Sequence, residues 1–124
     1  MINFDLSEEQ VLIKKTAKEF ARNELFKNVV ERDEKKLWPR EQVKKMADLG
    51  FLGMMVNEKW NGGGMDTISY SIAMEEIAAI DASASVIMSV NNSLVCYLIE
   101  HFGNQFQKEK YLKKLASGKK LGAF

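Results

Sequence analysis

Apolar residues recur along this chain with the spacing of helices. Ser7-Glu8-Glu9-Gln10 is typical of a helix start, where the Ser hydroxyl accepts a bond from the backbone three residues on and the Gln side chain reaches back. The next apolar residues fall on one face of a 3.6-residue period, and we expect this first helix to reach about Arg32. They are Ile13, Ala17, Phe20, Ala21 and Leu25.

A second helix is expected after Trp38-Pro39, because proline suits the first helical position. It ends at Gly50, where glycine can adopt the left-handed conformation that closes many helices. The apolar residues 51–56 are too few for a normal helix and predict a buried connector. The glycines at 62–64 then predict a turn, since neither a strand before them nor a Lys-Ser/Thr pair after them supports a phosphate-binding loop.

Two further helices are expected in the second half of the chain. One starts near Asp66 or Thr67, runs to Ile80 and is apolar on most sides, which is typical of a central helix. The other begins at a second capping pattern at residues 104–107, turns Leu112 and Leu115 inward and ends at Ser117-Gly118.

Residues 82–99 form a run of 18 residues without a formal charge. This length approaches that of a transmembrane helix. The run also carries four serines and the adjacent amides Asn91 and Asn92, which would be costly in mid-bilayer without partners. We therefore favour a helix buried by protein. Together these patterns predict an all-α, up-and-down bundle of about five helices, with residues 121–124 extended at its end.

Composition fits an ordinary globular domain, with 46% hydrophobic and 28% charged residues and a net charge of +1 over 124 residues. Nothing in this balance indicates a nucleic acid or a membrane as partner. The lysines between residues 104 and 124 are read as solvating a terminal helix, although a basic patch can attract phosphate or an acidic partner. The single Cys96 and the acidic first residues indicate a cytoplasmic, bacterial setting.

No catalytic constellation can be assembled from spacing alone. His101 is the only imidazole and has no partner that the sequence places beside it, so a structural role is favoured. No convergent set of metal ligands is present, and Glu75 and Glu76 diverge on a helix instead of forming an acid/base pair. The residues alone therefore predict a helical module that binds something at its centre or docks onto another domain.

Several motifs, in order and over essentially the whole chain, resemble the acyl-CoA dehydrogenase family. The run at residues 88–94 resembles its short-chain, butyryl-type members in particular. The motifs are Phe4-x-Leu6-x-Glu8-Glu9-Gln10, Trp38-Pro39-Arg40-Glu41, Met74-Glu75-Glu76-Ile77-Ala78, Met88-Ser89-Val90-Asn91-Asn92-Ser93-Leu94 and Gln107-Lys108-x-Lys110-Tyr111-Leu112.

The resemblance implies that residues 1–118 are the N-terminal helical domain and that 119–124 open a middle β-domain. It implies FAD as cofactor, with Phe124 as the first residue of the segment that contacts the flavin ring. The family's catalytic glutamate, which takes the α-proton while the flavin takes the β-hydride, belongs to a part outside this chain. No residue here is assigned a catalytic role, and the fragment alone is expected to be inactive.

The resemblance also assigns the helix around residues 86–94 to the acyl end of the thioester pocket, through Val86, Ile87, Val90, Asn91 and Leu94. The last four share a helical stripe, which by itself is more typical of a core than of a pocket. An amide at Asn91 would match a long alkyl chain poorly, so we expect a short acyl group and expect Asn91→Gly to shift preference toward longer chains. Family partners would be a short-chain acyl-CoA, an electron-transferring flavoprotein and three further copies in a homotetramer.

Two alternatives stay open at this point. The first keeps the fold but changes the reaction to that of an acyl-CoA oxidase or nitroalkane oxidase, reoxidised by oxygen. The second is a naturally truncated helical module that serves only in binding or assembly. Oxygen uptake without another acceptor would indicate the former, and a stop codon directly after Phe124 the latter.

Overall fold

The computed structural model of the chain describes residues 2–124, whose regular structure is entirely helical, without a strand. The predicted all-α fold is confirmed. In chain order the elements are α1 (Glu8–Phe20) continuing into the π-helix η1 (Ala21–Leu25), α2 (Val29–Glu34), α3 (Arg40–Asp48), the 3-10 helix η2 (Glu58–Trp60), α4 (Thr67–Ala78), α5 (Ala82–Ser89) continuing through the π-helix η3 (Val90–Cys96) into α6 (Tyr97–Phe102), and α7 (Gln105–Gln107) continuing through the π-helix η4 (Lys108–Leu112) into α8 (Lys113–Ala116).

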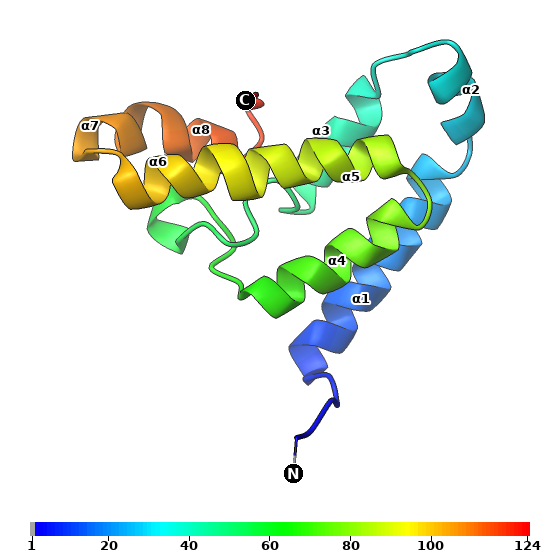
Figure 1. Cartoon of the computed structure of the whole chain (residues 1–124), viewed down its shortest axis with the longest axis horizontal. Coiled ribbons are helices and arrows are strands. Elements are labelled where there is room, and N and C mark those ends of the chain that lie inside the picture. Colours follow the sequence, from blue (N-terminus) through cyan, green and yellow to red (C-terminus); the bar gives the residue numbers. More distant parts are fainter. Residues whose placement is uncertain (1) are drawn as a thin grey trace.

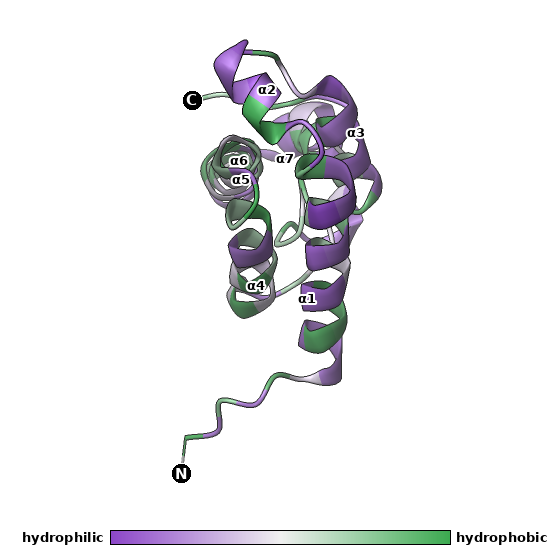
Figure 2. Cartoon of the chain, turned by 90° about the vertical axis from the view of Figure 1, so that its right-hand side faces the viewer, coloured by the Kyte–Doolittle hydropathy of each residue, from purple (hydrophilic) through white to green (hydrophobic). Residues whose placement is uncertain are grey.

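The long helix formed by α5, η3 and α6 runs across the molecule, with α1 and α4 packed together at one end and α7 to α8 at the other (Figure 1). The C-terminus lies beside the middle of this helix (Figure 1). Hydrophilic colour is concentrated on α1, α2 and α3 (Figure 2). Large apolar side chains are nevertheless exposed in both halves of the chain, among them Phe4, Phe26, Phe102 and Phe106.

The first helix begins as its sequence pattern predicts. The Ser7 hydroxyl accepts a hydrogen bond from the backbone of Gln10, and the Gln10 side chain accepts one from the backbone of Ser7. All five residues of the predicted apolar face are buried, so the face is confirmed. The aromatic ring of Phe20 meets that of Phe51 edge to face, with centroids 5.9 Å apart.

The expected continuation of this helix to Arg32 is wrong. The chain leaves helical geometry at Asn28, and Arg32 lies on a separate short helix, α2. The reason is visible in the Arg32 side chain, whose Nη2 turns back and donates to the carbonyl oxygen of Leu25 at 2.8 Å. A carbonyl left free at the end of the first helix is thus satisfied by a side chain beyond the break.

The second predicted helix is α3, which begins one residue after Pro39. The helix ends at Asp48, and Gly50, which follows the C-cap Leu49, has a φ of +79°, which confirms the expected left-handed position. The connector at residues 51–56 is buried as predicted, apart from Met55, which is half-buried. The core around it includes Met46 and Leu52, both fully inaccessible.

The predicted central helix is α4, and the Asp66 side chain caps it by accepting from the backbone of Ser69 at 2.7 Å. Hydrogen bonds from Ser69 lower the pKa of Asp66. Of the two adjacent glutamates, Glu75 is exposed, whereas Glu76 is 15% exposed and lies 3.8 Å from Lys14 on α1. The two carboxylates therefore do not converge.

The last helix starts with the predicted capping box, in which Asn104 and Gln107 each bond the other's backbone. Leu112 and Leu115 are buried in a second apolar cluster with Trp60. The helix ends where Gly118 adopts a φ of +74°.

Candidate functional site

The candidate site is built on the long helix, Ala82–Phe102. Asp81 caps its start by accepting from the backbone of Ala84 at 3.0 Å. By length and composition this helix could cross a membrane, but core helices of globular proteins pass the same test, and 33% of its most apolar stretch is buried within the chain. In this chain one side of the helix is buried and the other is open, so it is not enclosed on all sides.

Four of the five predicted pocket residues lie toward the open side. Val86 is 59% exposed and Leu94 is 40% exposed. Ile87 and Val90 are half-buried. These four side chains are hereafter the outer wall. They give the helix an apolar, accessible flank about two turns long.

A shallow groove of about 390 Å³ adjoins the start of the outer wall. Val86 and Ile87 line it together with Leu37, Trp38 and residues of the loop before α3. Trp38 is 54% exposed there. From the sequence, Trp38 was interpreted as part of a helix start and of a family motif, and not as a residue of the site. Its exposure beside the outer wall depends on the packing of the loop onto α5, which no local pattern reveals.

The fifth predicted residue, Asn91, is placed differently. Its side chain is completely buried, on the side of the helix away from solvent. Its Nδ2 donates to the carbonyl oxygens of Leu52 at 2.7 Å and Leu115 at 3.0 Å, and its Oδ1 accepts from the backbone N–H of Gly122 at 2.8 Å. Asn91 thus holds backbone segments of this chain and is separated from the outer wall. The expectation that Asn91 shares one stripe with Ile87, Val90 and Leu94 does not fit this geometry.

Asn92 is buried beside it and also bonds the backbone. Its Oδ1 accepts from Met54 N–H at 2.8 Å, and its Nδ2 donates to the oxygens of Phe51 and Met88 at 2.7 and 3.0 Å. Both amides lie in the π-helix η3. A π turn holds more residues than an α turn, so neighbouring side chains diverge less and both can point inward.

The Cys96 thiol is not activated, and His101 contacts a residue of its own helix. Burial raises the pKa of the Cys96 thiol to about 12, so it stays protonated at neutral pH. His101 Nδ1 lies 2.9 Å from the carbonyl oxygen of Tyr97, and the two rings are stacked. Within residues 2–124 no three metal-ligating side chains gather.

Phe124, the predicted flavin contact, is 93% exposed at the end of an extended segment. A free aromatic side chain is suited to contact a flat heteroaromatic ring. Phe124 is the only residue of this chain that was predicted to contact a flavin, and its exposed ring is compatible with such a contact.

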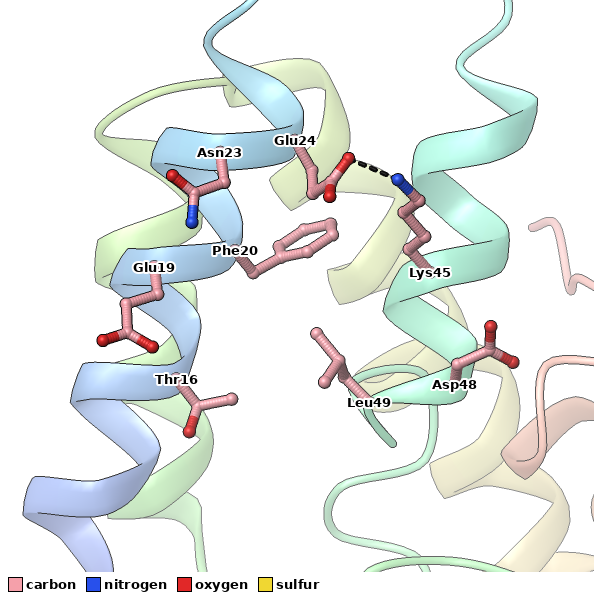
Figure 3. Close-up of a pocket in the computed structure, with 8 residues that line it drawn as sticks. All are labelled: Thr16, Glu19, Phe20, Asn23, Glu24, Lys45, Asp48 and Leu49. Carbon is pink, nitrogen blue, oxygen red and sulfur yellow. Dashed lines mark hydrogen bonds and ion pairs between the residues drawn. The ribbon is translucent and has the colours of Figure 1, made fainter.

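A second groove, of about 360 Å³, lies between the first helix and α3 (Figure 3). Phe20 and Leu49 form its apolar part, and Glu24 pairs with Lys45 across one end. Glu19 and Asp48 add two carboxylates to its lining. None of the predicted site residues lies here. Sequence reasoning missed the groove because its two sides come from segments more than twenty residues apart.

The sequence of this chain is similar to those of known enzymes. The family model for the acyl-CoA dehydrogenase N-terminal domain matches residues 7–119. The chain is 40% identical to the short-chain specific acyl-CoA dehydrogenase of Clostridium acetobutylicum, over 99% of this chain and 32% of that protein. It therefore spans about a third of the length of such relatives.

Solved structures agree. A chain in a structure described as the electron transferring flavoprotein of Acidaminococcus fermentans superposes with a TM-score of 0.92 and 38% identity, covering 97% of this chain and 32% of that one. Butyryl-CoA dehydrogenase from Megasphaera elsdenii gives a TM-score of 0.89 and 36% identity, with the same coverage. The family resemblance predicted from the motifs is confirmed. The chain belongs to the acyl-CoA dehydrogenase family and corresponds to its N-terminal domain.

Proposed function

We propose that this chain is the N-terminal domain of an FAD-dependent dehydrogenase that converts a short-chain acyl-CoA to its trans-2-enoyl-CoA. The observation that carries the proposal is the similarity to a short-chain specific enzyme over 99% of the chain. The division into a helical domain, residues 1–118, and the start of a β-domain, residues 119–124, belongs to the same proposal.

Within such an enzyme the outer wall would border the alkyl end of the substrate. Val86, Ile87, Val90 and Leu94 present only hydrocarbon, and their accessible flank would exclude water from the acyl chain. Each methylene buried against it would contribute about 0.8 kcal/mol to binding. Phe124 would contact the flavin ring. FAD, when bound, supplies the hydride acceptor, and the proton-abstracting base would come from outside residues 1–124.

The proposal includes the partners that the family implies. An electron-transferring flavoprotein would accept the electrons, which is supported by the description of the Acidaminococcus fermentans structure that this chain resembles. A homotetramer and a cytoplasmic location complete it.

The direct test is a turnover assay on the whole protein loaded with FAD. With butyryl-CoA we expect bleaching of the flavin absorbance and formation of the enoyl-CoA when an electron acceptor is present. We expect the 124-residue chain alone to give neither. Absence of bleaching with acyl-CoA substrates of every length would contradict the proposal, and rapid oxygen uptake without another acceptor would replace it with an oxidase.

The outer wall makes a second prediction about substrate length. Ile87→Ala and Leu94→Ala each remove methylenes from the wall, so a longer acyl chain gains space. We expect the kcat/KM ratio for hexanoyl-CoA over butyryl-CoA to rise by about tenfold, since two more buried methylenes correspond to roughly 1.6 kcal/mol. Leu12→Ala is the matched control, because Leu12 is 63% exposed on α1, outside the wall.

An unchanged kcat/KM ratio in both variants would show that the outer wall does not border the acyl chain. Asn91→Gly, which the sequence suggested for the same purpose, is not a suitable probe. Since Asn91 is buried and holds three backbone segments, we expect its loss to act on folding and on the position of Gly122.

A further inference from the structure

One hydrogen bond joins the extended C-terminal segment to the long helix. In the described part of the chain, the bond from Gly122 N–H to Asn91 Oδ1, 2.8 Å long, is the only hydrogen bond that residues 121–124 make. The preceding backbone bond joins Lys120 to Lys114, within the region of the last helix. The path of residues 121–124 therefore depends on Asn91.

The orientation of the Asn91 amide is fixed by its other contacts. Its Nδ2 lies within hydrogen-bond distance of two carbonyl oxygens, those of Leu52 and Leu115. Reversing the amide would place Oδ1 against two acceptors and Nδ2 against the Gly122 N–H, so every contact would become unfavourable. The carbonyl of Asn91 consequently has to face Gly122.

Packing constrains Gly122 from the same side. A Cβ added at this glycine would lie 2.6 Å from Val95 Cγ1, closer than such atoms approach. Val95 lies one turn after Asn91 on the long helix. Gly122 is thus in contact with the helix through both its N–H group and its α-carbon. Only a residue without a side chain can come this close.

We propose that Asn91 is a positioning residue that sets the distance between the outer wall and the segment carrying Phe124. This inference rests on the proposed function, in which the outer wall contacts the acyl chain and Phe124 the flavin ring. A single buried amide joins the two, because Asn91 lies in the helix that carries the wall and bonds the residue two before Phe124. Asn91 would thus fix the position of the outer wall relative to Phe124, although it contacts neither the acyl chain nor the flavin.

The proposal predicts different effects for substitutions of Asn91 and of Asn92. Asn92 is therefore the matched control. Both amides are buried in η3, and each makes three hydrogen bonds to the backbone. Asn92 holds the connector at residues 51–56 and has no bond to the C-terminal segment. A purely structural role predicts the same consequences for both alanine variants. A positioning role predicts that only Asn91→Ala disturbs Gly122 and the residues after it.

The first experiment uses the 124-residue chain and needs no flavin. Hydrogen exchange of the Gly122 amide is measured by NMR in the wild type, Asn91→Ala and Asn92→Ala, with each rate corrected for global stability. We expect protection in the wild type, a rise in rate of about tenfold or more in Asn91→Ala, and no excess rise in Asn92→Ala. An unprotected Gly122 in the wild type, or equal rates in the two variants, would overturn the proposal.

The second experiment uses the FAD-loaded enzyme and adds Gly122→Ala, which displaces the segment through Val95 while leaving the Asn91 side chain in place. At a temperature where all variants are folded, Asn91→Ala and Gly122→Ala should lower kcat for butyryl-CoA by about tenfold or more, with KM within about twofold, and alter the flavin absorption band. Asn92→Ala should leave kcat and the band unchanged. Identical behaviour of Asn91→Ala and Asn92→Ala would refute the positioning role.

The two proposals fail in distinguishable ways. If the wild-type enzyme oxidises no acyl-CoA, the proposed function is wrong, while the exchange rate of Gly122 still decides whether Asn91 holds the segment. If Asn91→Ala does not fold, Gly122→Ala carries the test, because residue 122 lies outside the helices and its substitution leaves both donor bonds of Asn91 intact.

Discussion

Asn92→Ala is expected to lower the free energy of unfolding by about 3–5 kcal/mol. Asn92 is 2% exposed, and within the described residues its amide is the only partner of two backbone groups, the N–H of Met54 and the carbonyl of Phe51. Alanine would leave both groups buried without a partner, at roughly 1–3 kcal/mol each, and would leave a cavity beside them.

Urea unfolding followed by circular dichroism measures this loss. The control is Asn104→Ala, because the Asn104 side chain is an exposed helix cap that accepts only from the backbone of Gln107, so its removal should cost about 1 kcal/mol. Equal losses for the two variants would show that burial of the Asn92 amide contributes nothing beyond an ordinary cap.

The second large effect is expected at the buried ion pair between Arg32 and Asp81. Arg32 Nη2 lies 2.8 Å from Asp81 Oδ2, and the side chains are 11% and 6% exposed. Asp81→Ala removes this partner and also the cap of α5, so we expect a loss of about 4 kcal/mol or more. The remaining guanidinium would be buried without a counter-charge, which is the largest part of the penalty.

Two further variants check this origin by the same unfolding measurement. Arg32→Met combined with Asp81→Asn removes both charges but keeps a capping side chain, and we expect it to be more stable than Asp81→Ala. Arg32 Nη1 has no hydrogen-bond partner within residues 2–124, so the pair is incompletely satisfied and its replacement by uncharged groups is tolerable. Glu31→Ala breaks the exposed pair with Lys35 and should change stability by less than about 0.5 kcal/mol.

The local features of this fold were predictable because they depend on residues three or four apart. The two capping boxes and the buried face of α1 arise from such spacings and appear as expected. Gly50 likewise marks the end of α3, since a positive φ is accessible to glycine at no steric cost. The 3.6-residue period of the apolar positions also predicted that Ile87 and Leu94 lie on the same side of the long helix.

The predictions that failed depend on residues distant in sequence. The stripe of four included Asn91, and spacing could not show that carbonyls of Leu52 and Leu115 lie on the inner side of the helix. The break after Leu25 was missed because its carbonyl is satisfied by Arg32, whose own position depends on Asp81 nearly fifty residues later. The spacing of residues within one helix does not predict such long-range contacts.

The outer wall has a consequence for how sequence variation here should be interpreted. Polar substitutions at Val86 or Leu94 change side chains that are already 59% and 40% accessible, so selection for folding of this chain alone would tolerate them. Selection for catalysis in the complete enzyme would not, if these side chains border the substrate. In a library of variants, polar substitutions on the outer wall should therefore leave protein abundance unchanged but lower turnover. Substitutions on the buried side of the same helix should lower abundance.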